Sequence, residues 1–167
     1  MRMIWTDGAC KGNPGPGGYG VVIVEDGKVT YKYSETCEDT TNNREELKAI
    51  LHAFKIACEN YRFETVYVYS DSAYCVNMIN DWIWSWAKND WKNSKKKTVE
   101  NLDLVLQIHQ YLTMEFFPCQ MVKVSGHSGI AANELADALA TNDERKYNKI
   151  LTTEGLEEDL IDFSENL

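Results

Sequence analysis

The chain has 167 residues, 44% of them hydrophobic, so it can bury about two-thirds of its unfolded surface in one core and should form one main domain. No apolar run is long enough for a membrane span and no signal-peptide pattern is present, which leads us to expect a soluble, cytoplasmic monomer. The net charge of −9 does not exclude a nucleic-acid partner, because residues 88–97 carry a local balance of +4 and residues 148–167 carry a balance of −5.

The first part of the sequence predicts three strands followed by a helix. Runs of β-branched and aromatic residues, separated by turn-forming segments, predict strands at residues 4–6, 19–24 and 29–34. Apolar residues between Leu47 and Cys58 then recur at the spacing of an amphipathic helix, which Asn42 or Asn43 could cap. Three strands in succession predict an antiparallel meander.

The rest of the sequence alternates between strands and helices. Strands are expected at residues 66–69 and 120–124, and helices at residues 72–79, 102–112 and 131–145. A meander followed by such alternation predicts an α/β fold, with a mixed sheet flanked by helices. The last residues, 148–167, contain six acids and one lysine, and this composition predicts a flexible C-terminal tail.

Four acidic residues stand where a functional site could form. Asp7 and Asp71 follow predicted strands, and ligands of open α/β sheets bind outside the carboxyl ends of the strands. Taken alone, each would more often be a turn or helix cap. Glu46 lies in the first turn of its helix, where an acid stabilises the macrodipole, and Asp137 could lie on a solvated helix surface. Only their combined context distinguishes a site from these structural roles.

Five motifs give that context. In chain order they are TDGACKGNPGPGGYG at residues 6–20, TTNNREEL at 40–47, SDS at 70–72, GHSG at 126–129 and NELAD at 133–137. Their order and intervals resemble type I ribonuclease H over residues 1–147. The resemblance implies a ribonuclease H-like fold with a mixed five-stranded sheet flanked by helices, in one domain that ends before the tail.

The resemblance also implies a metal-dependent endonuclease that cleaves the RNA strand of RNA/DNA hybrids. In that reading the metal ligands and catalytic residues are Asp7, Glu46, Asp71 and Asp137. Four carboxylates within ~4 to 5 Å repel one another by roughly 1 to 4 kcal/mol per close pair, so such a cluster requires cations. Oxygen ligands favour Mg²⁺, with Mn²⁺ as a substitute. We expect two Mg²⁺ ions with bound substrate, and products with 5′-phosphate and 3′-hydroxyl ends.

Two further residues receive roles from the resemblance. His127, in the glycine-flanked loop, matches a histidine that assists proton transfer or product departure, for which a near-neutral pKa is suited. Glu134 matches an acid that lies near the metal ions. Without the resemblance, a single loop histidine would be only a weak indication of catalysis.

Contacts with the hybrid are expected from two regions. Around the site loops the matching positions are Cys10, Asn13, Thr41, Asn42 and Asn43, although the asparagines could simply cap a helix. Further along the chain, Trp82 with the lysines Lys92, Lys95 and Lys96 resembles a basic handle that grips the DNA strand. Ala87, Asn89 and Asp90 make this handle less basic than others of its kind.

Two alternatives remain open at this stage. A relative with the same fold, such as an integrase or resolvase, would cut DNA, although the NNREE and GHSG segments favour hybrid cleavage. A binding module without catalysis would lack one of the four carboxylates, and all four are present. The tail could cover the basic handle, or bind a protein partner through Leu160, Ile161 and Phe163.

Overall fold

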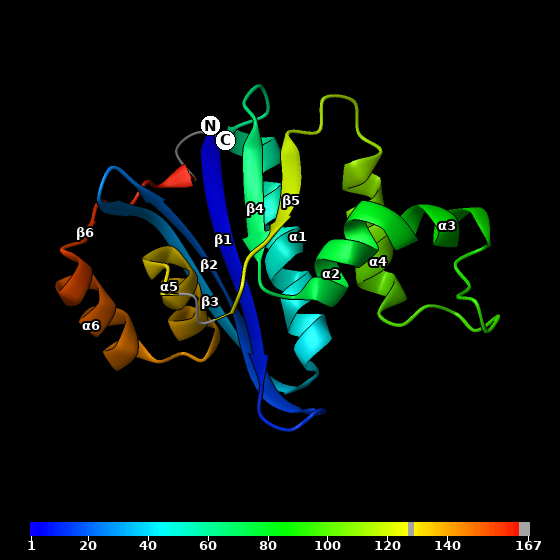
Figure 1. Cartoon of the computed structure of the whole chain (residues 1–167), viewed down its shortest axis with the longest axis horizontal. Helices are drawn as coiled ribbons and strands as arrows, with labels where there is room; N and C mark the ends of the chain where they lie inside the picture. The colour runs from blue at the N-terminus through cyan, green and yellow to red at the C-terminus, as the bar shows by residue number, and fades with distance from the viewer. Residues whose placement is uncertain (127–128, 164–167) are drawn as a thin grey trace.

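A six-stranded mixed sheet with helices on both faces forms the centre of the computed structural model, which describes residues 1–126 and 129–163 (Figure 1). The strands are β1 (Arg2–Cys10), β2 (Gly15–Glu25), β3 (Lys28–Thr40), β4 (Val66–Ser70), β5 (Cys119–Lys123) and β6 (Glu157–Glu158). The helices are α1 (Asn42–Asn60), α2 (Ala73–Asn77), the π-helical η1 (Met78–Trp82), α3 (Ile83–Lys88), α4 (Leu102–Leu112), α5 (Ala131–Ala140) and α6 (Glu144–Glu154). The α/β fold predicted from the sequence is confirmed.

The strand order is β5-β4-β1-β2-β3-β6. Strands β1, β2 and β3 form the predicted antiparallel meander, whereas β4 is parallel to β1 and β5 is parallel to β4. The parallel pairing of β1 with β4 brings the middle of β1 beside the carboxyl end of β4, since Trp5 pairs with Tyr69. Strand β1 continues beyond the predicted residues 4–6 to Cys10, so Asp7 lies within it and does not follow it. Among the described residues, the sixth strand is the difference from the expected five, and it comes from the C-terminal segment.

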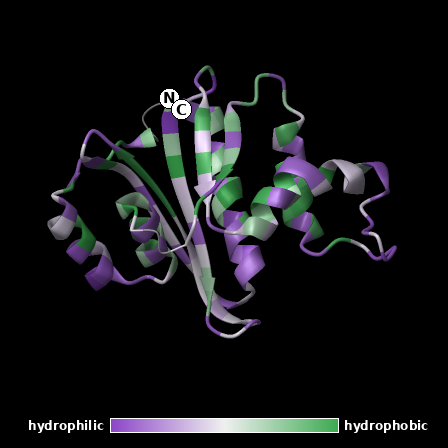
Figure 2. Cartoon of the chain, in the orientation of Figure 1, coloured by the Kyte–Doolittle hydropathy of each residue, from purple (hydrophilic) through white to green (hydrophobic). Residues whose placement is uncertain are grey.

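Two hydrophobic cores lie on opposite faces of the sheet. Successive residues of a strand point to opposite faces, so Ile4 enters the core under α1, whereas Trp5 enters the core under α5. In the same way, Val21 enters the core under α1 and Val22 the core under α5. Because both faces of the central strands are covered, their sequences are continuous apolar runs. Figure 2 shows apolar residues concentrated on these strands and on the helices around them. No helix in the described part of the chain is long and apolar enough to cross a membrane.

Two glycines allow the helices to approach the sheet closely. A Cβ atom at Gly8 would lie 2.3 Å from the backbone nitrogen of Glu46, so a larger residue would push α1 away from β1. A Cβ atom at Gly20 would lie 2.5 Å from the carbonyl oxygen of Ala136, at the surface of α5. These two contacts fix the helix positions that carry Glu46 and Asp137.

Three predicted helix boundaries differ from the structure. Helix α1 is capped by Thr41, whose side chain accepts a hydrogen bond from the backbone nitrogen of Arg44, and not by Asn42 or Asn43. The helix predicted at residues 72–79 continues through η1 to Lys88. The helix predicted at residues 131–145 is interrupted after Ala140, because Asn142 adopts a positive φ of 53° and the chain then starts α6.

The expected flexible tail differs from the structure over residues 148–163. Leu151 and Leu156 pack against the core under α5, and Phe163 lies against Tyr31 and Tyr61. Strand β6 pairs in parallel with β3, and the main chain continues this pairing through Ile161, which donates to the carbonyl of Thr30. The acidic composition suggested solvation, but the apolar residues between the acids provide a packed surface. Residues 164–167 lie outside the described part.

We predict that Gly8→Ala lowers the free energy of unfolding by roughly 1 to 3 kcal/mol, because the added methyl group overlaps the backbone at the start of α1. The measurement is urea unfolding of both proteins. A Gly8→Ala variant as stable as the wild type would contradict the close approach.

Candidate active site

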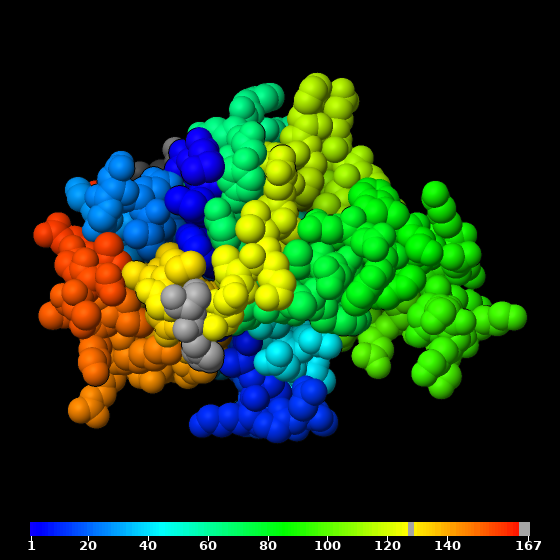
Figure 3. Space-filling view, viewed as in Figure 1, coloured from blue at the N-terminus to red at the C-terminus, as the bar shows by residue number. Residues whose placement is uncertain are grey.

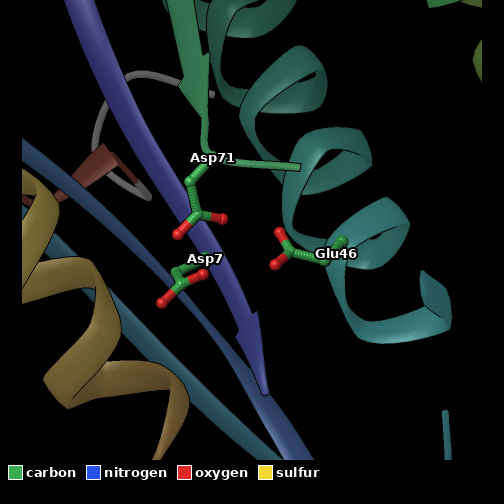
Figure 4. A group of neighbouring side chains, drawn as sticks. All are labelled: Asp7, Glu46 and Asp71. Carbon is green, nitrogen blue, oxygen red and sulfur yellow. The ribbon is translucent and has the colours of Figure 1, made fainter. Parts of the chain in front are cut away.

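Three of the four expected carboxylates meet at one point between β1, α1 and β4. Asp7 lies within β1, Glu46 in the first turns of α1, and Asp71 directly after β4. One carboxylate oxygen of each residue lies within 4.8 Å of the other two. Figure 4 shows that the three side chains point toward one another. Their convergence follows from the pairing of β1 with β4 and from the approach of α1 at Gly8.

The cluster is largely removed from water. Asp7 is 5% exposed and Glu46 is 3% exposed, while Asp71 is partly exposed. Oδ1 of Asp7 accepts a hydrogen bond of 3.0 Å from the backbone nitrogen of Gly8. The Oε2 atom of Glu46 is buried and has no hydrogen-bond partner among the residues that the structure describes. A buried carboxylate oxygen without a partner is costly, so this atom is available to a cation.

Burial and mutual repulsion make these acids hard to ionise in the metal-free protein. Burial raises the pKa of Asp7 to about 8, and the negative charges of Asp71 and Asp137 act in the same direction. Burial also raises the pKa of Glu46 well above its ordinary value, again with help from Asp7 and Asp71. A divalent cation would remove both penalties, and a set of oxygen ligands fits a hard ion such as Mg²⁺. The residues present therefore fit the metal that the sequence led us to expect.

The fourth expected carboxylate, Asp137, lies on α5 and is close to Asp7. Its charge and a side-chain hydrogen bond both contribute to the raised pKa of Asp7, which places the two groups close together. In the metal-free protein Asp137 forms an ion pair with Lys146 of α6, and the Nζ atom of Lys146 lies 3.3 Å from Oε2 of Glu134. Sequence reasoning did not identify Lys146, because it stands on a different helix and belongs to none of the five motifs. The predicted catalytic His127 lies outside the described residues.

Five of the predicted contacts with the hybrid lie where β1 ends and α1 begins. The backbone nitrogen of Asn42 donates to Oδ1 of Asn13 at 3.0 Å, and Thr41 caps α1 beside it. The Sγ atom of Cys10 lies 2.8 Å from the carbonyl oxygen of Gly12. Together with Asn43 on α1, these residues form a polar group at the start of the helix that carries Glu46, and we call this group the polar rim.

The other predicted contacts lie on the segment of residues 82–97, which we call the handle. It projects at one end of the molecule, beyond α2 (Figures 1 and 3). Trp82 is 37% exposed, its ring centroid lies 6.2 Å from that of Trp86, and both line a surface hollow with Lys92. Lys95 and Lys96 are exposed on the following loop. Trp86 and Trp91 also pack against the core.

The fold and the carboxylate cluster define an α/β protein with an acidic cluster that could hold a metal ion. The family model described as RNase H matches residues 1–145. Ribonuclease H of Caldicellulosiruptor saccharolyticus is 44% identical over 140 residues, which cover 83% of this chain and 92% of that protein. Ribonuclease H of Syntrophomonas wolfei is 45% identical over 141 residues, covering 84% and 93%. The chain therefore belongs to the ribonuclease H family of enzymes, as its motifs predicted.

Solved structures agree with this assignment. The solution structure of the PFV RNase H domain superposes with a TM-score of 0.72 at 25% identity, covering 84% of this chain and 92% of that one. The structure of LC11-RNase H1 in complex with an RNA/DNA hybrid superposes with a TM-score of 0.62 at 24% identity, covering 90% and 99%. At such identities the second comparison supports the fold alone.

We predict that Asp7→Asn stabilises the metal-free protein, and that the stabilisation grows as the pH rises from about 5 to about 8. The pKa of Asp7 in the folded protein, about 8, is above its unfolded value, so its contribution to stability is complete below about pH 4 and is lost as the pH rises through 8. The asparagine removes this loss, which amounts to at most about 1.4 kcal/mol per pH unit.

The measurement is thermal unfolding in EDTA at both pH values. Asp26→Asn provides the control, because Asp26 is an exposed turn residue with a positive φ of 50°, which asparagine tolerates. Equal stability of wild type and Asp7→Asn at both pH values would show that the cluster carries no such charge penalty.

Proposed function

We propose that this protein hydrolyses the RNA strand of RNA/DNA hybrids, and that Asp7, Glu46, Asp71 and Asp137 hold the divalent cations for this reaction. The observation that carries the proposal is the buried cluster of three carboxylate oxygens within 4.8 Å of one another, together with a Glu46 oxygen without a partner among the described residues. Membership of the ribonuclease H family supports the same activity.

The chemistry follows from what these side chains can hold. Two bound Mg²⁺ ions, or Mn²⁺ in their place, would supply an activated water and a stabilised leaving 3′ oxygen, so that the products carry 5′-phosphate and 3′-hydroxyl ends. The chain's own part is to fix the ligand oxygens before substrate arrives. Asp7 is fixed by the β1 ladders and Glu46 by the start of α1, so little reorganisation is needed when the phosphate binds.

A proton must reach the leaving oxygen, and we propose His127 for that transfer. Its motif GHSG begins at Gly126, where a Cβ atom would lie 3.2 Å from Oδ2 of Asp71. The start of this loop is therefore next to the carboxylates, although His127 itself lies outside the described residues. Glu134 on α5 is an additional acid on the same side of the site.

The polar rim would distinguish a hybrid from a DNA duplex. Only the 2′-hydroxyl group separates RNA from DNA chemically, and hydrogen-bonding groups are needed to detect it. Cys10, Asn13, Asn42 and Asn43 provide such groups, and Thr41 stands at the N-terminus of α1, where a phosphate is favoured. This arrangement supports recognition of both strands around the cleavage point.

The handle would bind the DNA strand of the hybrid at a point distant from the carboxylates. Trp82 offers an exposed aromatic face, and Lys92, Lys95 and Lys96 offer charges for phosphates. Stacking of a base on an aromatic ring contributes ~1 to 3 kcal/mol, and each lysine adds an attraction that salt weakens. Binding should therefore weaken as the salt concentration rises, despite the negative charge of the whole protein.

The test is cleavage of matched RNA/DNA, DNA/DNA and RNA/RNA duplexes in Mg²⁺ or in EDTA. We expect cleavage of the RNA strand of the hybrid alone, dependence on the metal, and loss of at least about a hundredfold in rate for Asp7→Asn. Asp26→Asn, which makes the same chemical change on the surface, should retain the wild-type rate.

Each other outcome contradicts the proposal in a recognisable way. Cleavage of the DNA duplex would indicate a DNA nuclease or integrase-like enzyme of the same fold. Binding of the hybrid without cleavage would indicate a non-catalytic binding module. Full activity of Asp7→Asn would remove the carboxylate cluster from the mechanism.

A further inference from the structure

Lys146 places a positive charge against the fourth carboxylate of the site. Its Nζ atom forms an ion pair with Oδ2 of Asp137, and it lies 3.3 Å from Oε2 of Glu134. The lysine side chain is 32% exposed, and those of Asp137 and Glu134 are 27% and 23% exposed. The contact is therefore partly shielded from water, and an ion pair in such surroundings is stronger than one on an open surface.

The backbone of Lys146 is held firmly in place. Its nitrogen donates a hydrogen bond of 2.9 Å to Oδ1 of Asp143, which caps α6. The next residue, Tyr147, is 3% exposed and packs in the core under α5. The backbone of Lys146 is thus held in place on α6, and its side chain extends to Asp137 on α5.

The C-terminal segment anchors this helix to the sheet. The hydroxyl group of Tyr147 donates to Oε1 of Glu158 at 2.7 Å, and Nζ of Lys32 donates to the same oxygen at 2.7 Å. Glu158 belongs to β6, which pairs with β3. The family model ends at residue 145, just before Lys146, so the anchor lies in the part of the chain that the model does not cover.

A lysine and a divalent cation cannot both occupy the same side of Asp137 without repulsion. Two positive charges a few ångströms apart repel each other, and Lys146 contacts Oδ2, one of the two oxygens that Asp137 could offer to a metal ion. A metal ion that binds through this oxygen requires the ammonium group to move away, and one that binds through the other oxygen is still repelled by it; the flexible four-carbon side chain of Lys146 permits the movement.

We propose that Lys146 is a resident counter-cation of the active site, which holds Asp137 and Glu134 in the metal-free protein and competes with the divalent cation for Asp137. In this way Lys146 raises the cation concentration at which the site fills. The inference rests on the metal-binding role of Asp137 in the proposed function. Lys146 acts through Asp137 and is therefore a positioning residue.

The test is calorimetric titration of the substrate-free protein with Mn²⁺ and with Mg²⁺. Lys146→Met removes the charge but keeps the length of the side chain, and we expect it to lower the dissociation constant for the cation by roughly three- to tenfold. Lys146→Arg keeps the charge and should bind the cation about as weakly as the wild type. The half-saturating Mg²⁺ concentration for hybrid cleavage should shift in the same direction.

Lys149→Met is the matched control, because Lys149 is an exposed lysine on the same helix. It reports the effect of removing one positive charge from α6 without touching Asp137, and we expect an unchanged dissociation constant. Thermal unfolding in EDTA checks that each variant is folded, and Lys146→Gln replaces Lys146→Met if the latter is not.

Two results would overturn the inference. Equal or weaker cation binding by Lys146→Met would show that the lysine does not compete with the metal. An equal gain in Lys149→Met would show that only the net charge matters. Absence of cation binding in the wild type would instead contradict the proposed function itself, so the two failures can be distinguished.

Discussion

The contact between α1 and β1 at Gly8 is the constraint on which the site depends. It places Glu46 beside Asp7 in the interior, where water screens their charges poorly. Asp71 joins them because β4 runs parallel to β1. The ladders of the central strands and the packing of α1 hold the three carboxylates together against their repulsion. Because the carboxylates are held close together, their ionisation is unfavourable without a cation. For the same reason, they need little rearrangement to bind one.

The opposite face of the sheet supplies the remaining charges. Gly20 lets α5 lie against β2, and this position carries Asp137 to the edge of the cluster. Helix α6 then brings Lys146 to Asp137, and β6 holds α6 against β3 through Glu158. The positive charge of Lys146 thus partly neutralises the negative charges of Asp137 and Glu134 in the metal-free protein. The C-terminal segment affects the site in this way, because it holds the helix that carries Lys146.

The elements that could be predicted are those with local signals. The amphipathic period located α4 at residues 102–112, and the motifs located the acids on β1, α1 and after β4. Strand β6 could not be predicted, because a strand of two residues is too short to show an alternating pattern. The break after Ala140 could not be predicted either, because it depends on the positive φ of Asn142. Glu158 contacts Lys32, which lies 126 positions earlier in the chain, and no local pattern indicates such a contact. The acidic composition of the C-terminal segment therefore suggested a solvated tail. Lys146 was missed for a different reason: it is only nine positions from Asp137, but its contact depends on the break after Ala140, which starts a second helix.

Location of a bound cation would show directly whether Asp7, Glu46 and Asp71 form a metal site. Crystals soaked in Mn²⁺ would reveal the ion by its anomalous scattering, independently of any activity. We expect a peak coordinated by carboxylate oxygens of Asp7, Glu46 and Asp71, with the Glu46 oxygen that lacks a partner among the described residues as a ligand. Mn²⁺ bound elsewhere, with this cluster empty at millimolar concentrations of the ion, would contradict it.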